Sequence, residues 1–215
     1  MKKVGILGSG IVGQTLANGF LKYGYEVMVG TRDLTKLTEW KENAGEKGQI
    51  GSFSDSAAFG SILVLAVKGS IATNALEMAG DDNLKNKTII DATNPIADAP
   101  PDNGVIKYFT GPNQSLMEQY QETYPNAHFV KAFSCIGNAK MVNPDYHGQK
   151  PTMFICGNNA DAKTEVSSIL DLFGFDIADM GSIEAARAIE PLAMLWCIPG
   201  LINNQWDHAF KLIKP

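Results

Sequence analysis

The chain has 215 residues, of which 45% are hydrophobic and 19% are charged, and its formal net charge is -5. This composition is typical of a folded globular protein, and an acidic balance without a run of Lys or Arg argues against nucleic acid as a partner. The longest apolar run, residues 192–202, is interrupted by Pro199-Gly200 and is too short to cross a bilayer, so we expect no membrane span. The three cysteines lie far apart and lack metal-ligand spacing. We therefore expect a cytoplasmic protein with neither a structural disulfide nor a metal site.

Short apolar segments alternate with amphipathic ones along most of the chain. Strands are predicted at residues 4–7, 26–29, 62–67, 88–91, 128–132, 153–156 and 175–178. Helices are predicted at residues 11–23, 33–43, 71–79 and 160–173, and another begins after Ser115, where Ser115 and Glu118 form a capping-box pattern. Residues 98–111 are rich in Pro, Asp and Gly and are read as a loop.

This alternation predicts right-handed crossovers and a doubly wound parallel sheet, that is, an α/β fold of the Rossmann type. The alternation stops at Gly181-Ser182, beyond which the pattern is helical. We therefore expect a Rossmann domain over residues 1–181 and a small helical C-terminal appendage over residues 182–215 that packs on it. The appendage would either close the ligand-binding side of the domain or form a dimer interface.

The turn after the first predicted strand reads Gly8-Ser9-Gly10-Ile11-Val12-Gly13. A glycine-rich turn alone is a weak signal, but this one joins a strand to a helix and a second strand follows, which is the context of a dinucleotide-binding turn. Gly8 permits the tight turn, Gly10 lets the backbone approach a pyrophosphate, and Gly13 lets the helix pack against the strand. The helix N-terminus then offers N–H groups to the phosphates. The alternative is a strand-turn-helix unit that binds no ligand.

The residues after the second predicted strand indicate which dinucleotide binds. NAD-binding proteins place an acidic side chain here for the ribose hydroxyls, whereas this chain has Gly30-Thr31-Arg32. Gly30 brings no carboxylate to repel a 2′-phosphate, Thr31 can donate a hydrogen bond, and Arg32 can pair with the phosphate. Lys36 lies on the same helical face as Arg32 and adds a second charge. Asp33 can be read as a displaced ribose acid, but we interpret it as the cap of the second helix, so the pattern predicts NADP rather than NAD.

Three further strand ends lie on the side of a doubly wound sheet where ligands bind: Ala66-Val67-Lys68, Asn94-Pro95 and residues 132–138. We expect these loops to surround the nicotinamide. Each has an alternative reading: Lys68 as a solvated lysine, Asn94-Pro95 as a turn, and Cys135, a candidate nucleophile, as a small buried apolar group. The three histidines show neither metal spacing nor a triad partner, so no catalytic residue is assigned.

The chain resembles the NADPH-dependent coenzyme F420 reductases, which pass hydride between NADP(H) and a deazaflavin. It is also similar to the cytosolic oxidoreductase domain of the Steap metalloreductases. The resemblance runs along nearly the whole chain. It is carried by the glycine turn, by Gly30-Thr31-Arg32, and by three segments that point to this family in particular: Asp91-Ala92-Thr93-Asn94-Pro95, Lys131-Ala132-Phe133-Ser134 and Ile189-Glu190-Pro191-Leu192-Ala193-Met194.

The resemblance implies contacts of the chain with two parts of the cofactor. The pyrophosphate would be held by Ser9, Gly10, Ile11 and Val12, and the 2′-phosphate by Thr31, Arg32 and Lys36. It also implies direct hydride transfer between two stacked rings, which needs alignment and exclusion of water more than an acid or a base. Two departures leave the acceptor open: Ser134 stands where the deazaflavin reductases have a histidine, and residues 68–70 lack a Pro-Trp that many relatives carry.

We therefore expect an NADP-dependent oxidoreductase that passes hydride between NADP(H) and a flavin-like acceptor such as FMN, or a deazaflavin of the coenzyme F420 type. Two alternatives stay open. One is a reductase of a small imine or carbonyl substrate with Lys68 as the only candidate proton donor, and the other is a non-catalytic NADP(H) sensor. Residues 194–196 suit a core or interface position better than a substrate contact, but the acceptor pocket is predicted to be lined by Asn94, Pro95, Phe133, Ser134, Ile136 and Met194.

The predicted appendage is rich in large apolar residues. Exposed patches of that kind usually bind a partner, so we expect a homodimer, with the small-molecule hydride acceptor as the other partner. The residues concerned are Leu192, Leu195, Trp196, Ile198, Leu201, Ile202 and Trp206.

Overall fold

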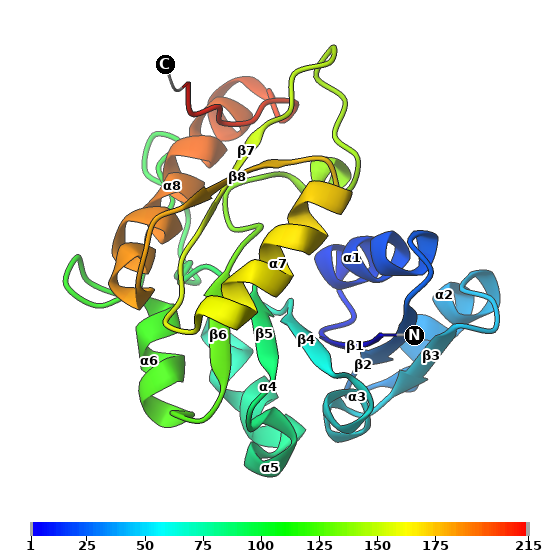
Figure 1. Ribbon diagram of the computed structural model, residues 1–215. Helices are drawn as coiled ribbons and strands as arrows, with labels where there is room; N and C mark the ends of the chain where they lie inside the picture. The colour runs from blue at the N-terminus through cyan, green and yellow to red at the C-terminus, as the bar shows by residue number, and fades with distance from the viewer. Residues whose placement is uncertain (1, 214–215) are drawn as a thin grey trace.

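A computed structural model describes residues 2–213 and contains a six-stranded parallel sheet in the order β3-β2-β1-β4-β5-β6 (Figure 1). The order reverses between β1 and β4, which is the switch point of a doubly wound sheet. The predicted Rossmann fold is therefore confirmed. The strands are β1 (Lys3–Leu7), β2 (Glu26–Gly30), β3 (Gly48–Gly51), β4 (Ile62–Leu65), β5 (Thr88–Asp91) and β6 (His128–Lys131).

Helices cover both faces of this sheet (Figure 1). One hydrophobic core joins the sheet to α1 and α7, and the other joins it to α3, α4, α5, α6 and the start of α8. Strands covered on both faces are continuously apolar, and β4 shows this directly because all four of its residues are buried. The helices are α1 (Ile11–Lys22), α2 (Thr38–Asn43), α3 (Phe53–Phe59), α4 (Ala72–Ala79), α5 (Asp81–Leu84), α6 (Leu116–Thr123), α7 (Ala160–Leu172) and α8 (Ala186–Asn203).

Some elements differ from the sequence prediction. The segment predicted as one helix over residues 33–43 is a 3₁₀ turn, η1 (Leu34–Leu37), followed by α2. The strand β3 and the helix α3 were not predicted. The sequence of β3 is Gly-Gln-Ile-Gly, which has no apolar run because the strand lies at the edge of the sheet. A signal for α3 was present, since Ser52 and Asp55 form a capping box at its start.

The last two predicted strands exist but lie outside the main sheet. Strands β7 (Thr152–Ile155) and β8 (Asp176–Asp179) pair in parallel with each other. They connect to the main sheet through an antiparallel bridge between Lys131 and Cys156. The helix α7 between them begins at Ala160 as predicted and packs on the face that α1 also covers.

The helical C-terminal segment is present as α8, but the helix ends at Asn203, so that the predicted helical pattern is wrong for the residues that follow. The helix continues through Pro191 and Pro199. A proline cannot donate a backbone hydrogen bond within a helix, and the packing of α8 on the domain compensates for this loss. With its preceding turn (Ile183–Asn203) it is long and apolar enough to cross a bilayer by length and composition alone, which is weak evidence because core helices of folded domains pass the same test. Residues 204–213 are not helical, and Phe210 and Leu212 hydrogen-bond with Thr152 of β7. The homodimer stays a prediction.

A buried ion cluster joins α8 to the sheet. The Nζ of Lys131 lies 2.6 Å from Asp91 Oδ2 and 2.9 Å from Glu190 Oε1, and these side chains are 0%, 0% and 2% exposed. Asp91 Oδ1 also accepts hydrogen bonds from the backbone N–H and hydroxyl of Thr93. The Glu190 carboxylate accepts hydrogen bonds from two backbone N–H groups in the first turn of α6. The cluster therefore fixes the carboxyl ends of β5 and β6 and the start of α6 to the second turn of α8.

The charges in this cluster compensate one another. Burial disfavours the Lys131 ammonium, but the carboxylates of Asp91 and Glu190 outweigh this cost and raise the pKa of Lys131 to about 12. Removing one partner from a buried ion pair leaves the opposite charge uncompensated, which is far more damaging than losing a pair at the surface.

We predict that Lys131→Met destabilises the protein by about 3–5 kcal/mol in denaturant unfolding, because two buried carboxylates lose their counter-charge. The control, Lys85→Met, removes an exposed lysine paired with Asp81 and Asp82, and should cost below about 1 kcal/mol. Because the folded-state pKa of Lys131 is raised, its stabilisation is complete below about pH 10.5 and is lost as the pH rises through about 12. Equal stability of Lys131→Met and the wild type would contradict this account.

Candidate functional site

The carboxyl ends of the central strands lie in register. Leu7 at the end of β1 pairs with Gly30 of β2 and Leu65 of β4, Leu65 pairs with Asp91 of β5, and Asp91 pairs with Lys131 of β6. The loops that follow these strands therefore leave the sheet at one edge. This is the edge at which doubly wound sheets bind their ligands.

The three glycines of the turn after β1 have different surroundings. A side chain at Gly8 would overlap the Ala66 carbonyl, and Gly8 has a φ of +139°, a conformation that L side chains rarely adopt. A side chain at Gly13 would overlap the Gly8 carbonyl, so the close helix–strand approach expected there is present. At Gly10 a Cβ would meet nothing within 4 Å. The open space at Gly10 is where a dinucleotide-binding turn admits its pyrophosphate.

A cavity of about 510 Å³, which we call the dinucleotide cavity, opens beside this turn. No side chain caps the N-terminus of α1, so N–H groups of its first turn remain available to an anion. Three positively charged side chains, Arg32, Lys36 and Lys68, line the cavity. The open turn and these charges fit a dinucleotide that carries an additional phosphate. The lining residues are Gly8, Ser9, Gly10, Thr31, Arg32, Asp33, Lys36, Phe53, Ala66, Val67, Lys68 and Ile71.

Gly30 stands where NAD-binding proteins carry an acid, and the structure explains why no side chain is present. A Cβ at Gly30 would lie 2.9 Å from the Cβ of Ser56 and 3.1 Å from the ring of Phe53, both on α3. Asp33 does cap the turn that begins the next helix, as predicted, because its carboxylate accepts hydrogen bonds from the Thr35 N–H and hydroxyl. These hydrogen bonds lower the pKa of Asp33. Its carboxylate is thus engaged within its own turn.

Thr31 connects the two loops that form the cavity wall. Its hydroxyl lies 3.1 Å from the hydroxyl of Ser9 and 3.2 Å from the Asp33 carbonyl, and it accepts a hydrogen bond from the Asp33 N–H. Arg32 and Lys36, in contrast, are exposed. The structure thus presents two exposed cations beside a hydroxyl held by hydrogen bonds, which suits recognition of a phosphate.

The loops after β4, β5 and β6 also meet. Val67, Lys68 and Asn94 line a smaller cavity of about 240 Å³. The side-chain amide of Asn94 donates a hydrogen bond of 2.8 Å to the Ser134 carbonyl, so it connects the loops after β5 and β6. Asn94 Oδ1 and Ser134 Oγ are buried without a hydrogen-bond partner in the described residues. Pro95 is buried beside them and does not line this cavity.

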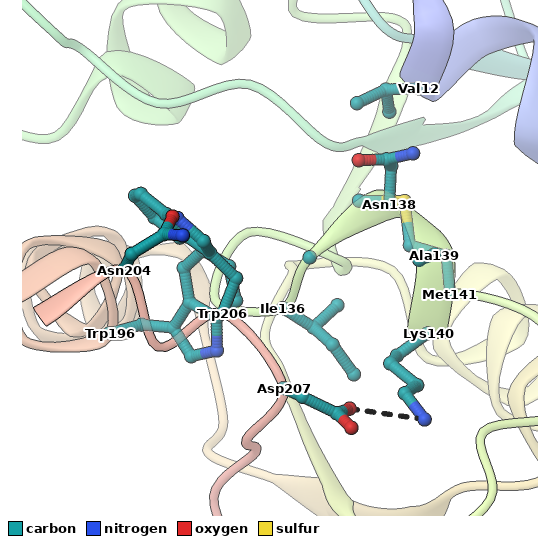
Figure 2. Close-up of a pocket in the computed structure, with 11 residues that line it drawn as sticks. Val12, Ile136, Asn138, Ala139, Lys140, Met141, Trp196, Asn204, Trp206 and Asp207 are labelled. Atoms are coloured by element: carbon teal, nitrogen blue, oxygen red, sulfur yellow. Dashed lines mark hydrogen bonds and ion pairs between the residues drawn. The ribbon is translucent and has the colours of Figure 1, made fainter. Parts of the chain in front are cut away.

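A larger cavity of about 800 Å³, the aromatic cavity, borders the glycine motif at Val12, whereas the dinucleotide cavity borders it at Gly8, Ser9 and Gly10. Figure 2 shows Val12 at one end, Ile136 in the floor and the Trp196 and Trp206 rings opposite. An ion pair of 3.1 Å between Lys140 and Asp207 lies at its edge. The lining residues are Val12, Ile136, Gly137, Asn138, Ala139, Lys140, Met141, Trp196, Asn204, Trp206 and Asp207.

Of the residues predicted for the acceptor pocket, only Ile136 lines this cavity. The prediction that Phe133 lines the pocket is wrong, because its ring packs in the core against Phe173 and Phe175. Its backbone has a φ of 60°, which turns the side chain away from the strand end. Ser134 is buried beneath Asn94, and Met194 is half-buried on α8 outside the lining.

Sequence reasoning missed most of the aromatic cavity. Gly137 and Asn138 were expected only as part of a loop around the nicotinamide, and residues 139–141 were not considered. Asn204, Trp206 and Asp207 reach the site only because the chain leaves α8 and turns back. Trp206 had been singled out only as part of an apolar surface. The available signal was Gly200, which we noted only, together with Pro199, as an interruption of the apolar run, and which provides space for the Trp206 ring.

The described residues offer no reactive side chain in the aromatic cavity beyond the Lys140–Asp207 pair. Burial raises the pKa of the Cys135 thiol to about 12, so it stays protonated at neutral pH and is a poor nucleophile. The ring of His208 stacks on Trp196 with centroids 5.1 Å apart, and its Nε2 lies 3.0 Å from the Trp196 carbonyl oxygen. Within residues 2–213 no group of His, Cys, Asp or Glu is arranged to hold a metal ion.

The contrast between Gly10 and Gly13 yields a paired prediction. Gly10→Ala should leave the free energy of unfolding within about 1 kcal/mol of wild type, because its Cβ meets nothing. It should still abolish NADP+ binding in calorimetry, because the Cβ occupies the space of the pyrophosphate. Gly13→Ala should destabilise the fold by roughly 2 kcal/mol or more, because its Cβ overlaps the Gly8 carbonyl. Normal NADP+ affinity in Gly10→Ala would place the pyrophosphate elsewhere.

Arg32→Ala should lower the preference for NADPH over NADH by about ten- to one-hundred-fold, the effect of one charge-assisted contact to a phosphate. The measurement is the ratio of the two dissociation constants, and affinity for NADH should be unchanged. Lys22→Ala, an exposed lysine at the far end of α1, serves as the control for a general charge effect. An unaltered ratio in Arg32→Ala would show that the 2′-phosphate binds to other groups.

Comparison with known proteins places this geometry in a family. The family model described as NADP oxidoreductase, coenzyme F420-dependent, matches residues 3–95. That stretch contains every residue lining the dinucleotide cavity and, of the aromatic cavity, Val12 alone. The crystal structure of a candidate F420-dependent NADP-reductase from Arthrobacter sp. FB24 is 31% identical, covers 100% of both chains and superposes with a TM-score of 0.92.

Curated relatives and more distant structures extend the comparison. Metalloreductase STEAP3 of Rattus norvegicus is 30% identical over 207 residues, and metalloreductase STEAP2 of Homo sapiens is 24% identical over 204 residues. These matches cover 93% of this chain but only 39% and 38% of those proteins. A reductive aminase from Aspergillus terreus, solved in complex with NADPH and ethyl levulinate, shares the fold at 17% identity, with a TM-score of 0.68 over 95% of this chain and 63% of that one. Together with the full-length structural match, the dinucleotide cavity shows that this chain belongs to the family of coenzyme F420-dependent NADP oxidoreductases.

Proposed function

We propose that this NADP oxidoreductase transfers hydride between NADP(H) and a planar flavin-like or deazaflavin acceptor, and that the acceptor occupies the aromatic cavity. The observation that carries the proposal is the position of that cavity. Val12 lines the aromatic cavity, while Gly10, two residues earlier in the same turn, lines the dinucleotide cavity. A ring in the first cavity would thus lie next to a cofactor in the second.

The residues of the chain position both reactants. Arg32, Lys36 and the first turn of α1 hold the phosphates, while Val12 and Ile136 provide apolar surface against which two rings can stack. When bound, NADPH supplies a hydride to the acceptor ring, which takes up a proton from solvent. Proximity and exclusion of water carry most of the rate enhancement in such a reaction. The small number of ionisable groups around the aromatic cavity agrees with this chemistry.

One observation favours a second candidate, reduction of a small imine or carbonyl substrate. The Lys140–Asp207 pair stands in the wall of the aromatic cavity, with Lys140 25% exposed and Asp207 77% exposed on their side chains. The Lys140 ammonium could protonate a substrate nitrogen or oxygen as hydride arrives on carbon, with the Asp207 carboxylate holding it in position. Lys68, the donor expected from the sequence, lines the dinucleotide cavity and the small cavity beside Asn94, and not the aromatic cavity.

The test is the rate of NADPH oxidation with coenzyme F420, FMN and a cyclic imine measured side by side. We expect turnover with at least one ring acceptor, and Lys140→Met should change that rate by less than about three-fold because no proton donor from the protein is required. For imine reduction the same variant should lose about 10²-fold or more. Turnover with the imine alone, abolished in Lys140→Met, would replace the first proposal with the second. NADPH binding without turnover on any acceptor would contradict both.

A further inference from the structure

The wall of the aromatic cavity opposite Val12 is built by a segment that we call the C-terminal strap, residues 204–213. The strap leaves α8 at Asn204, whose backbone is left-handed with φ 54° and ψ 33°. It is then tied to the domain at several points. Asp207 pairs with Lys140, Lys211 pairs with Asp176 and donates to the Lys150 carbonyl, and Phe210 and Leu212 hydrogen-bond with Thr152 of β7.

Each tryptophan of this wall lies against a glycine. A Cβ at Gly200 would overlap three ring atoms of Trp206, and a Cβ at Gly137 would lie 3.1 Å from two ring atoms of Trp196. The absence of these side chains lets the indole of Trp206 lie directly on the α8 backbone. The two indole centroids are 5.6 Å apart with the rings inclined at 44°, so both rings form one continuous aromatic surface.

The polar atoms of the two indoles are already satisfied. Trp196 Nε1 donates to the His208 carbonyl at 2.9 Å, and Trp206 Nε1 donates to the side-chain oxygen of Asn204 at 3.0 Å. These hydrogen bonds fix the orientation of the rings. What each tryptophan presents to the cavity is therefore carbon, a surface on which a flat conjugated ring can stack.

The position of Trp206 is not explained by stability alone. The side chain is 41% exposed, whereas Trp196 beneath it is 9% exposed and belongs to the buried set. The strap has anchors of its own at Asp207, Lys211 and Leu212. A large, half-exposed aromatic ring held in one orientation at the mouth of a cavity is better suited to contact with a ligand than to packing.

We propose that Trp206, held on Gly200 by the C-terminal strap, is a specificity-determining residue that selects planar fused-ring acceptors over small aliphatic substrates. This inference rests on the proposed function and identifies the part of the site that discriminates between acceptors. Val12, Ile136 and Trp206 line the same cavity, and a fused ring has more surface than a small imine with which to contact them at once. Trp206 does not line the dinucleotide cavity, so the dinucleotide affinity should not depend on it.

The experiment measures binding of FMN and of coenzyme F420 by titration calorimetry in the presence of NADP+. For the ring that the wild type binds, Trp206→Ala should weaken binding about ten-fold, which corresponds to about 1.4 kcal/mol. Gly200→Ala should reproduce this loss, because its Cβ displaces the indole while strengthening the helix backbone. Trp206→Phe should recover most of the affinity. The dissociation constant for NADP+ alone should stay within about two-fold in all variants.

Lys211→Ala is the matched control, because it removes two anchors of the strap without changing a residue that lines the cavity. It should bind the ring within about two-fold of wild type. Wild-type ring affinity in Trp206→Ala and Gly200→Ala would overturn the role of Trp206 and leave the proposed function intact. A loss in Lys211→Ala as large as that in Trp206→Ala would also overturn it, by assigning the effect to the strap as a whole. If the wild type binds neither ring and oxidises NADPH with neither, the proposed function itself fails.

Discussion

The ammonium of Lys131 is buried between the carboxylates of Asp91 and Glu190, and the geometry of the ligand-binding edge depends on this arrangement. Placing three charges in a protein interior is unfavourable unless each is compensated. Compensation here requires that β5, β6 and α8 end up at fixed positions relative to one another. The loops that carry Asn94 and Ile136 leave directly from those two strands, and Trp196 lies less than two turns beyond Glu190 on α8. Electrostatics in the core thus determines where the loop that lines the small cavity and two walls of the aromatic cavity stand.

The dinucleotide cavity is shaped mainly by the absence of side chains. Gly8 and Gly13 permit contacts within the protein, whereas Gly10 leaves space that the protein itself does not use. Gly30 is constrained by Phe53 and Ser56 of α3, so the choice of NADP over NAD is connected to the packing of a helix behind the sheet. An acid could not be introduced at Gly30 without moving that helix. The preference predicted from Arg32 and Lys36 therefore also depends on the core.

Much of the fold could be predicted from the sequence because its signals are local. The strands β4 and β5 and the turn after β1 have apolar runs or glycine spacing that reflect burial on both faces and a close backbone approach. The strand β3 and the strap lack such signals. Their conformation comes from tertiary contacts, such as those of Thr152 with Phe210 and Leu212. The same limit explains Phe133, which follows β6 toward the ligand edge but turns into the core through a positive φ. The segments containing Asp91, Lys131 and Glu190 were recognised by resemblance, but their mutual pairing is a long-range contact that no local pattern reveals.

The two cavities draw on different parts of the chain. The dinucleotide cavity is lined by residues between Gly8 and Ile71, and the aromatic cavity, apart from Val12, by residues between Ile136 and Asp207. A mutation that reshapes one cavity therefore leaves the lining residues of the other cavity unchanged. With the acceptor in the aromatic cavity, as proposed, the two binding preferences could evolve independently, so that a lineage could exchange its electron acceptor while its reductant stayed the same. Such a division would allow one ancestral fold to supply reductases for unrelated oxidants through changes confined to its second half.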